Sequence, residues 1–194
     1  EPVAVWIKPR IAVQSDITSP QTDDDFDADR LGLQWQFNHN PVDSAWSLSE
    51  RKGMLTLHAL QADDFRSARN TLTQKTVGYK GMATVKMDFC RMADGQRCGL
   101  ACLGARNNVI GVKMEQGKAM LYFEADGKII ETYAVSGKTV YLRLEADATA
   151  NSYVFSYSKD GRKFSQAGEP FAMEFGNWKG VRVGLYCYNT GITS

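Results

Sequence analysis

The sequence predicts an all-β protein, an antiparallel β-sandwich of two sheets. Three observations support this fold class. Short segments alternate apolar and polar residues with the period of a half-buried strand. Turn signals separate these segments at intervals of about 8–14 residues, as in sandwiches and barrels. No segment shows a convincing helical period, so a doubly wound fold is excluded.

The alternation is clearest in residues 31–37, where Leu31, Leu33, Trp35 and Phe37 are predicted to share one face of a strand. The intervening glycine and glutamines take the other face. Comparable patterns predict strands over residues 31–37, 54–60, 82–89, 98–104, 108–115, 119–125, 128–135, 140–147, 153–158 and 181–189.

Hairpin turns are predicted at residues 93–95, 125–128 and 159–162, each of which contains an Asp-Gly pair. Tight hairpin turns require a positive φ, which glycine adopts without steric cost. The turns therefore support antiparallel pairing of the strands that flank them.

Composition bounds the class of protein. The chain has 194 residues, a hydrophobic fraction of 43% and a net charge of +1. This is enough apolar material for the core of one domain. The interspersed charges argue against a nucleic-acid or membrane partner, which would need a basic face. No apolar run approaches the ~18 residues that cross a bilayer.

Residues 1–22 are predicted to be a linker or edge segment, and residues 23–194 the sandwich, because prolines interrupt any central strand near the start. The start does not match a signal peptide, so we expect it to lie within a mature protein. The five aspartates of residues 23–29 offer carboxylates to a structural calcium ion. They lack the spacing of a calcium loop, which favours a solvated acidic loop instead.

Four cysteines raise the question of disulfides. Cys102 and Cys187 fall within predicted strands, where free cysteines are usually small buried residues. The spacing also allows a disulfide between Cys90 and Cys98 across a hairpin. A zinc site is not indicated, because no C-x-x-C pair is present and the two histidines are isolated.

Catalytic motifs are not found, and we predict no catalytic residue, metal ligand or cofactor in this chain. A β-sandwich glycosidase would place paired carboxylates along one strand. Segments starting at Glu124 and Glu145 approach that pattern but lack its third carboxylate.

Residues 68–76, "ARNTLTQKT", form an unusually polar segment for the middle of a domain. One interpretation is a solvated edge strand. The other is the rim of a surface that meets a sugar or another domain, because a cation and an amide suit sugar hydroxyls and backbone groups alike.

Three blocks of the sequence, over residues 23–59, 63–78 and 155–171, resemble the C-terminal β-sandwich of glycoside hydrolase family 43 β-xylosidases and α-L-arabinofuranosidases. The strings "GLQWQ", "NHNP" and "ARNTLTQ" carry most of this resemblance. It implies a concanavalin A-like jelly roll. It also implies a five-bladed propeller catalytic domain that precedes the sandwich in the same protein and carries the acidic catalytic residues.

The resemblance implies that the sandwich packs on the propeller and helps to shape a pocket for xylo- or arabino-oligosaccharides. We expect the contact at Asp64, Arg69, Asn70 and Leu72. The alternative for Arg69 is an internal ion pair with Asp63 or Asp64. We expect a periplasmic or extracellular location rather than a cytoplasmic one.

Two other functions stay open. The chain could be an independent carbohydrate-binding module for xylan-like polysaccharide, with Arg182, Tyr186 and Tyr188 as the binding face, because the alternation of residues 181–189 turns these three side chains away from the core face. Tyrosines that face a second layer or a domain interface are the commoner case. The third function is a purely structural packing domain.

Overall fold

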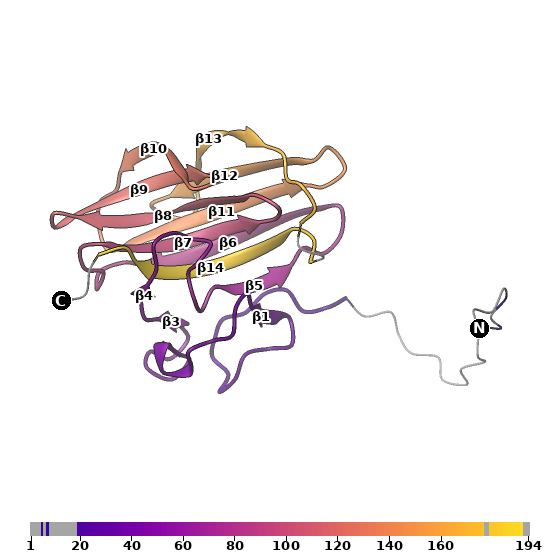
Figure 1. Ribbon diagram of the computed structural model, residues 1–194, viewed down its shortest axis with the longest axis horizontal. Coiled ribbons are helices and arrows are strands. Elements are labelled where there is room, and N and C mark those ends of the chain that lie inside the picture. Colours follow the sequence, from indigo (N-terminus) through magenta and orange to yellow (C-terminus); the bar gives the residue numbers. More distant parts are fainter. Residues whose placement is uncertain (1–4, 6, 8–18, 177–178, 192–194) are drawn as a thin grey trace.

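Two sheets of mainly antiparallel strands pack face to face, and a two-stranded hairpin forms a third, separate sheet (Figure 1). The structure is a computed structural model that describes residues 5, 7, 19–176 and 179–191. The only helical element among these residues is a short 3-10 helix, η1 (Asp43–Ala45). The described residues therefore contain no helix that is long and apolar enough to cross a membrane. The predicted all-β class is confirmed.

Fourteen strands are present in the described part of the chain. They are β1 (Trp35–Phe37), β2 (Trp46–Ser47), β3 (Thr56–Leu57), β4 (Leu60–Gln61), β5 (Leu72–Lys75), β6 (Lys80–Asp88), β7 (Gln96–Leu103), β8 (Asn107–Glu115), β9 (Lys118–Ala125), β10 (Lys128–Ala134), β11 (Thr139–Asp147), β12 (Ser152–Ser158), β13 (Ser165–Phe171) and β14 (Arg182–Asn189).

The larger sheet has the strand order β1-β5-β14-β7-β8-β9-β10, and β4 adds to β14 as the single parallel pairing. The smaller sheet has the order β13-β12-β11-β6. The last long strand of the chain, β14, therefore lies in the middle of the larger sheet. Strands β2 and β3 pair with each other in a separate hairpin, and β3 lies near the lower edge in Figure 1.

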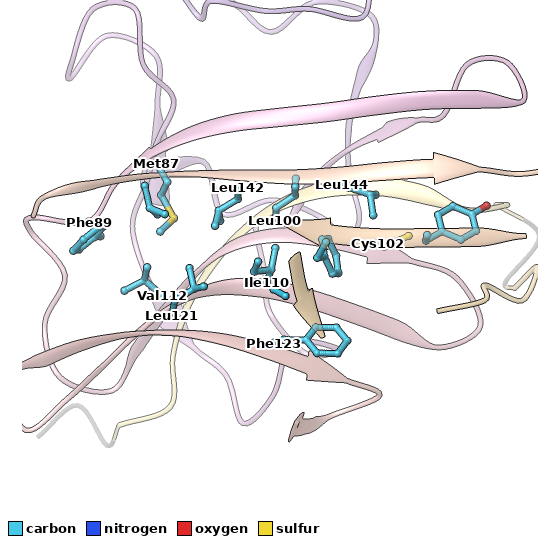
Figure 2. Packing of buried hydrophobic residues seen from close by; sticks show 14 of the residues in the cluster. Met87, Phe89, Leu100, Cys102, Ile110, Val112, Leu121, Phe123, Leu142 and Leu144 are labelled. Atoms are coloured by element: carbon cyan, nitrogen blue, oxygen red, sulfur yellow. The ribbon is translucent and has the colours of Figure 1, made fainter. Parts of the chain in front are cut away.

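The core lies between the two sheets. Figure 2 shows Leu142 and Leu144 of β11 facing Ile110 and Val112 of β8, with Phe123 of β9 at one end. Strict alternation places every second residue of these strands in this layer. Burial of the large aliphatic and aromatic side chains removes each from water, which is the main favourable contribution to folding.

Several predicted strands differ in detail. Leu33, predicted to share the buried face with Trp35, is fully exposed, because residues 32–35 form a turn closed by the Trp35 amide on the Gly32 carbonyl (3.1 Å). The predicted strand 54–60 is divided into β3 and β4, which belong to different sheets. Strand β13 was not predicted, because its sequence "SQAGEPF" contains glycine and proline.

Two of the three predicted hairpin turns are confirmed, those that join β9 to β10 and β12 to β13. The prediction of a hairpin at residues 93–95 is wrong, because these residues connect β6 to β7, which belong to different sheets. In the β9–β10 turn both Asp126 (φ 47°) and Gly127 (φ 81°) adopt positive φ, as a two-residue hairpin turn requires. The free cysteines Cys102 and Cys187 are buried, as predicted. Cys90 and Cys98 form no disulfide, and Cys98 instead lies opposite Cys187 in the register of β7 and β14.

Residues 1–22, predicted to be a linker or edge segment, lie largely outside the described residues, and 19–22 contain no strand. In the acidic loop that follows, Asp24 accepts hydrogen bonds from the Phe26 amide (2.8 Å) and the Trp35 indole (2.7 Å). This carboxylate ties the loop to β1. The described residues contain no group of three or more acidic, histidine or cysteine side chains that could hold a metal ion.

Candidate functional site

A segment of residues 62–71, here called the covering segment, lies over the outer face of the larger sheet, the face turned away from the smaller sheet. Three apolar side chains of this segment, Ala62, Phe65 and Ala68, are buried against the sheet. They form a second hydrophobic cluster with Ala101, Leu103, Val109, Tyr122, Tyr186 and Tyr188. The sheet is therefore covered on both faces in its centre.

Two tyrosines lie flat under this cover. Tyr186 of β14 is opposite Gly99 of β7, which is opposite Gly111 of β8, which is opposite Tyr122 of β9. The two glycines leave space that the Tyr186 ring occupies, since a Cβ at Gly99 would lie 2.9 Å from the Tyr186 hydroxyl oxygen. The ring of Phe65 packs edge-on against Tyr186, with the centroids 5.1 Å apart.

The prediction that Tyr186 and Tyr188 form an exposed carbohydrate-binding face is wrong, because neither side chain is exposed. Both side chains do leave the core face as the alternation predicts, but both are fully buried (0% exposed) beneath the covering segment. Arg182, predicted to share that face, is also buried (5% exposed). A sugar needs an exposed ring for stacking, and these rings are not exposed in the chain.

The polar strand β5 is not an edge strand. It lies between β1 and β14, and Thr71, Leu72 and Thr73 are all buried. The Thr73 hydroxyl donates to the Gln36 carbonyl (2.7 Å), so its polarity is satisfied locally. The interpretation of a solvated edge strand is therefore wrong.

Within the covering segment, Asp64 closes a tight turn with Ser67. The Asp64 carboxylate accepts hydrogen bonds from the Ser67 amide (2.8 Å) and the Ser67 hydroxyl (2.8 Å). These bonds lower the pKa of Asp64 below its ordinary value, the amide contributing most. The Asp64 side chain is exposed, and its charge sets the shape of the turn.

Arg69 is exposed but held in place. Its Nε and Nη2 atoms both donate to the Asn40 carbonyl, at 3.0 and 2.6 Å. Among the described residues it forms no ion pair with Asp63 or Asp64, so the predicted alternative of an internal ion pair is wrong. A guanidinium has five N–H donors in a rigid fork. The two bonds to Asn40 use one donor on Nε and one on Nη2, so the other donors of Arg69 can bind another group.

Asn70 and Leu72 lie inside the domain rather than on its rim. Asn70 is 2% exposed and adopts a positive φ of 58°. Its side-chain amide accepts from the Val42 amide (2.7 Å) and donates to the Val42 carbonyl (2.9 Å). Leu72 is fully buried. Both side chains are therefore enclosed within this chain, which contradicts their predicted place at the contact surface. Of the two roles open to Asn70, fixing the turn or bonding a partner, the bonds to Val42 support the first.

An ion pair between a half-buried arginine and a buried glutamate on the same outer face was not predicted. Arg97 of β7 donates to Glu124 of β9 (3.4 Å), and its guanidinium lies over the Tyr122 ring, 5.7 Å from the centroid. Burial raises the pKa of Glu124, while Arg97 opposes the shift and Asp64 adds to it. The alternation of β9 places Glu124 on the face of Tyr122, which was the available signal.

A cleft of about 530 Å³ lies between the hairpin of β2 and β3 and the ends of β6, β7 and β14. Two ion pairs hold the hairpin across it, Glu50 with Arg91 and Arg51 with Asp88, each at 2.9 Å. The His58 ring also contacts Glu50 at 2.9 Å. Each charged group of this set has an internal partner. The cleft is therefore bridged by structural ion pairs, and no pair of free carboxylates faces it.

Residues 23–194 match the model of the β-xylosidase C-terminal concanavalin A-like domain. The chain belongs to this family. The family match begins next to Asp24, the residue that ties the acidic loop to β1. The concanavalin A-like sandwich expected from the sequence blocks is confirmed by the family match and by the fold.

Relatives of this family domain are larger proteins. A putative β-xylosidase of Xylanibacter ruminicola is 42% identical over 95% of this chain and 34% of its own length. A β-xylosidase of Formosa agariphila is 33% identical over 97% of this chain and 35% of its own length. The bifunctional GH43-CE protein of Bacteroides eggerthii superposes with a TM-score of 0.82 and 32% identity, over 86% of this chain and 23% of its own.

The chain thus spans about a third of the length of the curated relatives that it matches. It corresponds to the accessory domain of these relatives, in which the remaining length holds the rest of the enzyme.

Proposed function

We propose that this chain is the non-catalytic C-terminal domain of a glycoside hydrolase of family 43, that it packs against a five-bladed propeller catalytic domain, and that it helps to shape the sugar pocket of that domain. Xylo- or arabino-oligosaccharides are the proposed substrates. Support comes from the relatives, which include two β-xylosidases and a non-reducing end α-L-arabinofuranosidase of Bacteroides ovatus. A periplasmic or extracellular location belongs to the same proposal.

The observation that carries the pocket-shaping role is the state of Arg69. An exposed arginine usually loses side-chain entropy when it binds a partner. Two hydrogen bonds to Asn40 already hold this one, and the loop beneath it is braced by Asn70. The remaining donors thus present a preorganised cation, which suits a hydroxyl, a carbonyl or a carboxylate of a neighbouring domain or sugar.

The covering segment supports the role in a second way. Its buried residues Phe65 and Ala68 anchor it to the sheet, while Asp63, Arg66 and Arg69, each next to a buried residue in the chain, are exposed. Charged side chains thus project from a segment that cannot move without opening a hydrophobic cluster. This arrangement fits a fixed contact surface better than a mobile loop.

An independent carbohydrate-binding module has less support, since the tyrosines that suggested it are buried. A purely structural packing domain makes a different prediction for Arg69, and one experiment separates the two. Arg69→Ala in the full-length enzyme should lower kcat/KM for an aryl xyloside or arabinofuranoside at least about tenfold, or ~1.4 kcal/mol of lost transition-state binding. The melting temperature should change by no more than about 2 °C.

Arg162→Ala is the matched control, because Arg162 is an exposed arginine on the β12–β13 turn, on the other sheet. It should leave kcat/KM unchanged. If Arg69→Ala lowers the melting temperature and leaves kcat/KM at the wild-type value, Arg69 is an internal brace and the chain is a packing domain only.

A further inference from the structure

Arg182 is a buried cation at the start of β14, on the outer face of the larger sheet. It lies opposite Leu103 of β7 on one side and Lys75 of β5 on the other. The residue is 5% exposed, although the neighbouring Asn38 is half-buried and Lys75 is exposed. The guanidinium is therefore just beneath the surface, between two side chains that reach solvent.

The hydrogen bonds of Arg182 go to neutral groups alone. Nη1 donates to the Thr73 hydroxyl (2.9 Å) and Nη2 donates to the Asn38 side-chain carbonyl (2.5 Å), while the buried Nε has no partner. A guanidinium has five N–H donors, so most of them are left without an acceptor. Burying a charge in this way is costly unless it is paired and hydrogen-bonded.

A counter-charge for Arg182 is missing among the described residues. No aspartate or glutamate among the described residues lies within ion-pair distance of Arg182. Burial is the one cause that lowers the pKa of Arg182. Arg97 provides the contrast on the same face of the same sheet, because it pairs with Glu124. The nearest charged strand neighbour of Arg182 is Lys75, which has the same sign, and like charges directly opposite on a sheet are destabilising.

The loop that binds Arg182 also binds Arg69. Asn38 accepts from Arg182, and the Asn40 carbonyl accepts from Arg69. Leu33, fully exposed, lies in the turn that precedes the same strand β1. The loop that follows β1 thus holds two arginines, Arg69 and Arg182, for which the described residues provide no acidic partner. Cations arranged in this way are complementary to an acidic surface of another domain.

We propose that Arg182 binds a carboxylate side chain supplied by the catalytic domain of the same protein, so that the surface around the loop after β1 is the docking surface of the sandwich. The inference rests on the proposed function. Two facts identify the partner. The relatives have about two thirds of their length outside this domain. An unpaired guanidinium selects a carboxylate, which it binds through two parallel hydrogen bonds.

The test compares Arg182→Met in this chain by itself and in the full-length protein, by differential scanning calorimetry at pH 7. In the chain alone the substitution removes an unpaired buried charge and keeps an unbranched aliphatic side chain. The melting temperature should stay within about 2 °C of wild type or rise. In the full-length protein the same substitution leaves the partner carboxylate unpaired, and the melting temperature of the sandwich should fall by at least about 4 °C.

Arg97→Met is the matched control, because it leaves Glu124 buried without its partner and should lower the melting temperature of both proteins. If Arg182→Met lowers both melting temperatures equally, the counter-charge lies within this chain and the inference is wrong. If Arg182→Met lowers the melting temperature of neither protein, Arg182 does not bind a carboxylate of the catalytic domain, but the two domains can still dock through other residues. If the wild-type sandwich melts at the same temperature alone and in the full-length protein, docking itself fails and the proposed function fails with it.

Discussion

The hydroxyl oxygens of Tyr122 and Tyr186 lie 2.7 Å apart, although β7 and β8 separate their strands in the sheet. The contact is made across Gly99 and Gly111, which are opposite each other in those two strands. Both tyrosines are fully buried, and burial raises the pKa of each phenol well above its ordinary value. The pair therefore stays protonated, and one hydroxyl donates to the other.

Gly111→Ala should destabilise the domain by about 2–3 kcal/mol, because the new Cβ would clash with the Tyr186 hydroxyl and with the Cys98 carbonyl. One of these neighbours is backbone and cannot turn aside. Urea unfolding followed by tryptophan fluorescence measures the loss. Gly81→Ala is the control, since a Cβ at that position meets nothing within 4 Å and should cost less than about 0.5 kcal/mol. An equal loss in both variants would mean that the tyrosine pair does not depend on the glycine.

Asn70→Ala should cost about 3 kcal/mol of stability in the same assay. The substitution removes two hydrogen bonds to Val42, worth ~1 kcal/mol each, and puts alanine at a φ of 58°, which asparagine tolerates better than alanine because its polar side chain bonds locally. Asn70→Gly removes the same bonds but tolerates the positive φ, so it should cost ~1 kcal/mol less. Equal losses in the two variants would show that the backbone conformation carries no part of the effect.

Asp88→Asn should weaken the domain at neutral pH but not at pH 2. Burial raises the pKa of Asp88, but hydrogen bonds from Cys90 and Arg51 outweigh it and lower the pKa to about 2. A lowered folded-state pKa means that this stabilisation is complete above the unfolded value of 3.8 and is lost as the pH falls toward 2. The stability gap between wild type and Asp88→Asn should therefore close between about pH 4 and pH 2.

Chemical denaturation at a series of pH values measures that gap. Arg51→Gln removes the partner from the other side and should show a stability loss that closes over the same interval, because it disrupts the same ion pair. A gap that is as wide at pH 2 as at pH 7 would mean that the charge of Asp88 contributes nothing and that its hydrogen bonds alone matter.

The sequence predicted the family correctly but placed only some of the contact residues correctly. The resemblance in residues 23–59 and 63–78 correctly indicated the family, since the family match covers residues 23–194. The site residues did not follow as well. Of the predicted contact residues, Asp64 and Arg69 are exposed while Asn70 and Leu72 are buried, because the covering segment turns back onto the sheet after Arg69.

The alternation of residues in the sequence is enough to assign the side chains of each long strand to one face of the sheet or to the other. In β14 the alternation separates Tyr186 and Tyr188 from Leu185 and Cys187, and the structure keeps that separation, because successive side chains of a strand point to opposite sides. Alternation does not say what covers a face, since that depends on contacts between residues far apart in the chain. Only the tertiary structure places Phe65 over Tyr186 and Asn38 against Arg182, which turns a predicted sugar-binding face into a second core with a buried, unpaired cation.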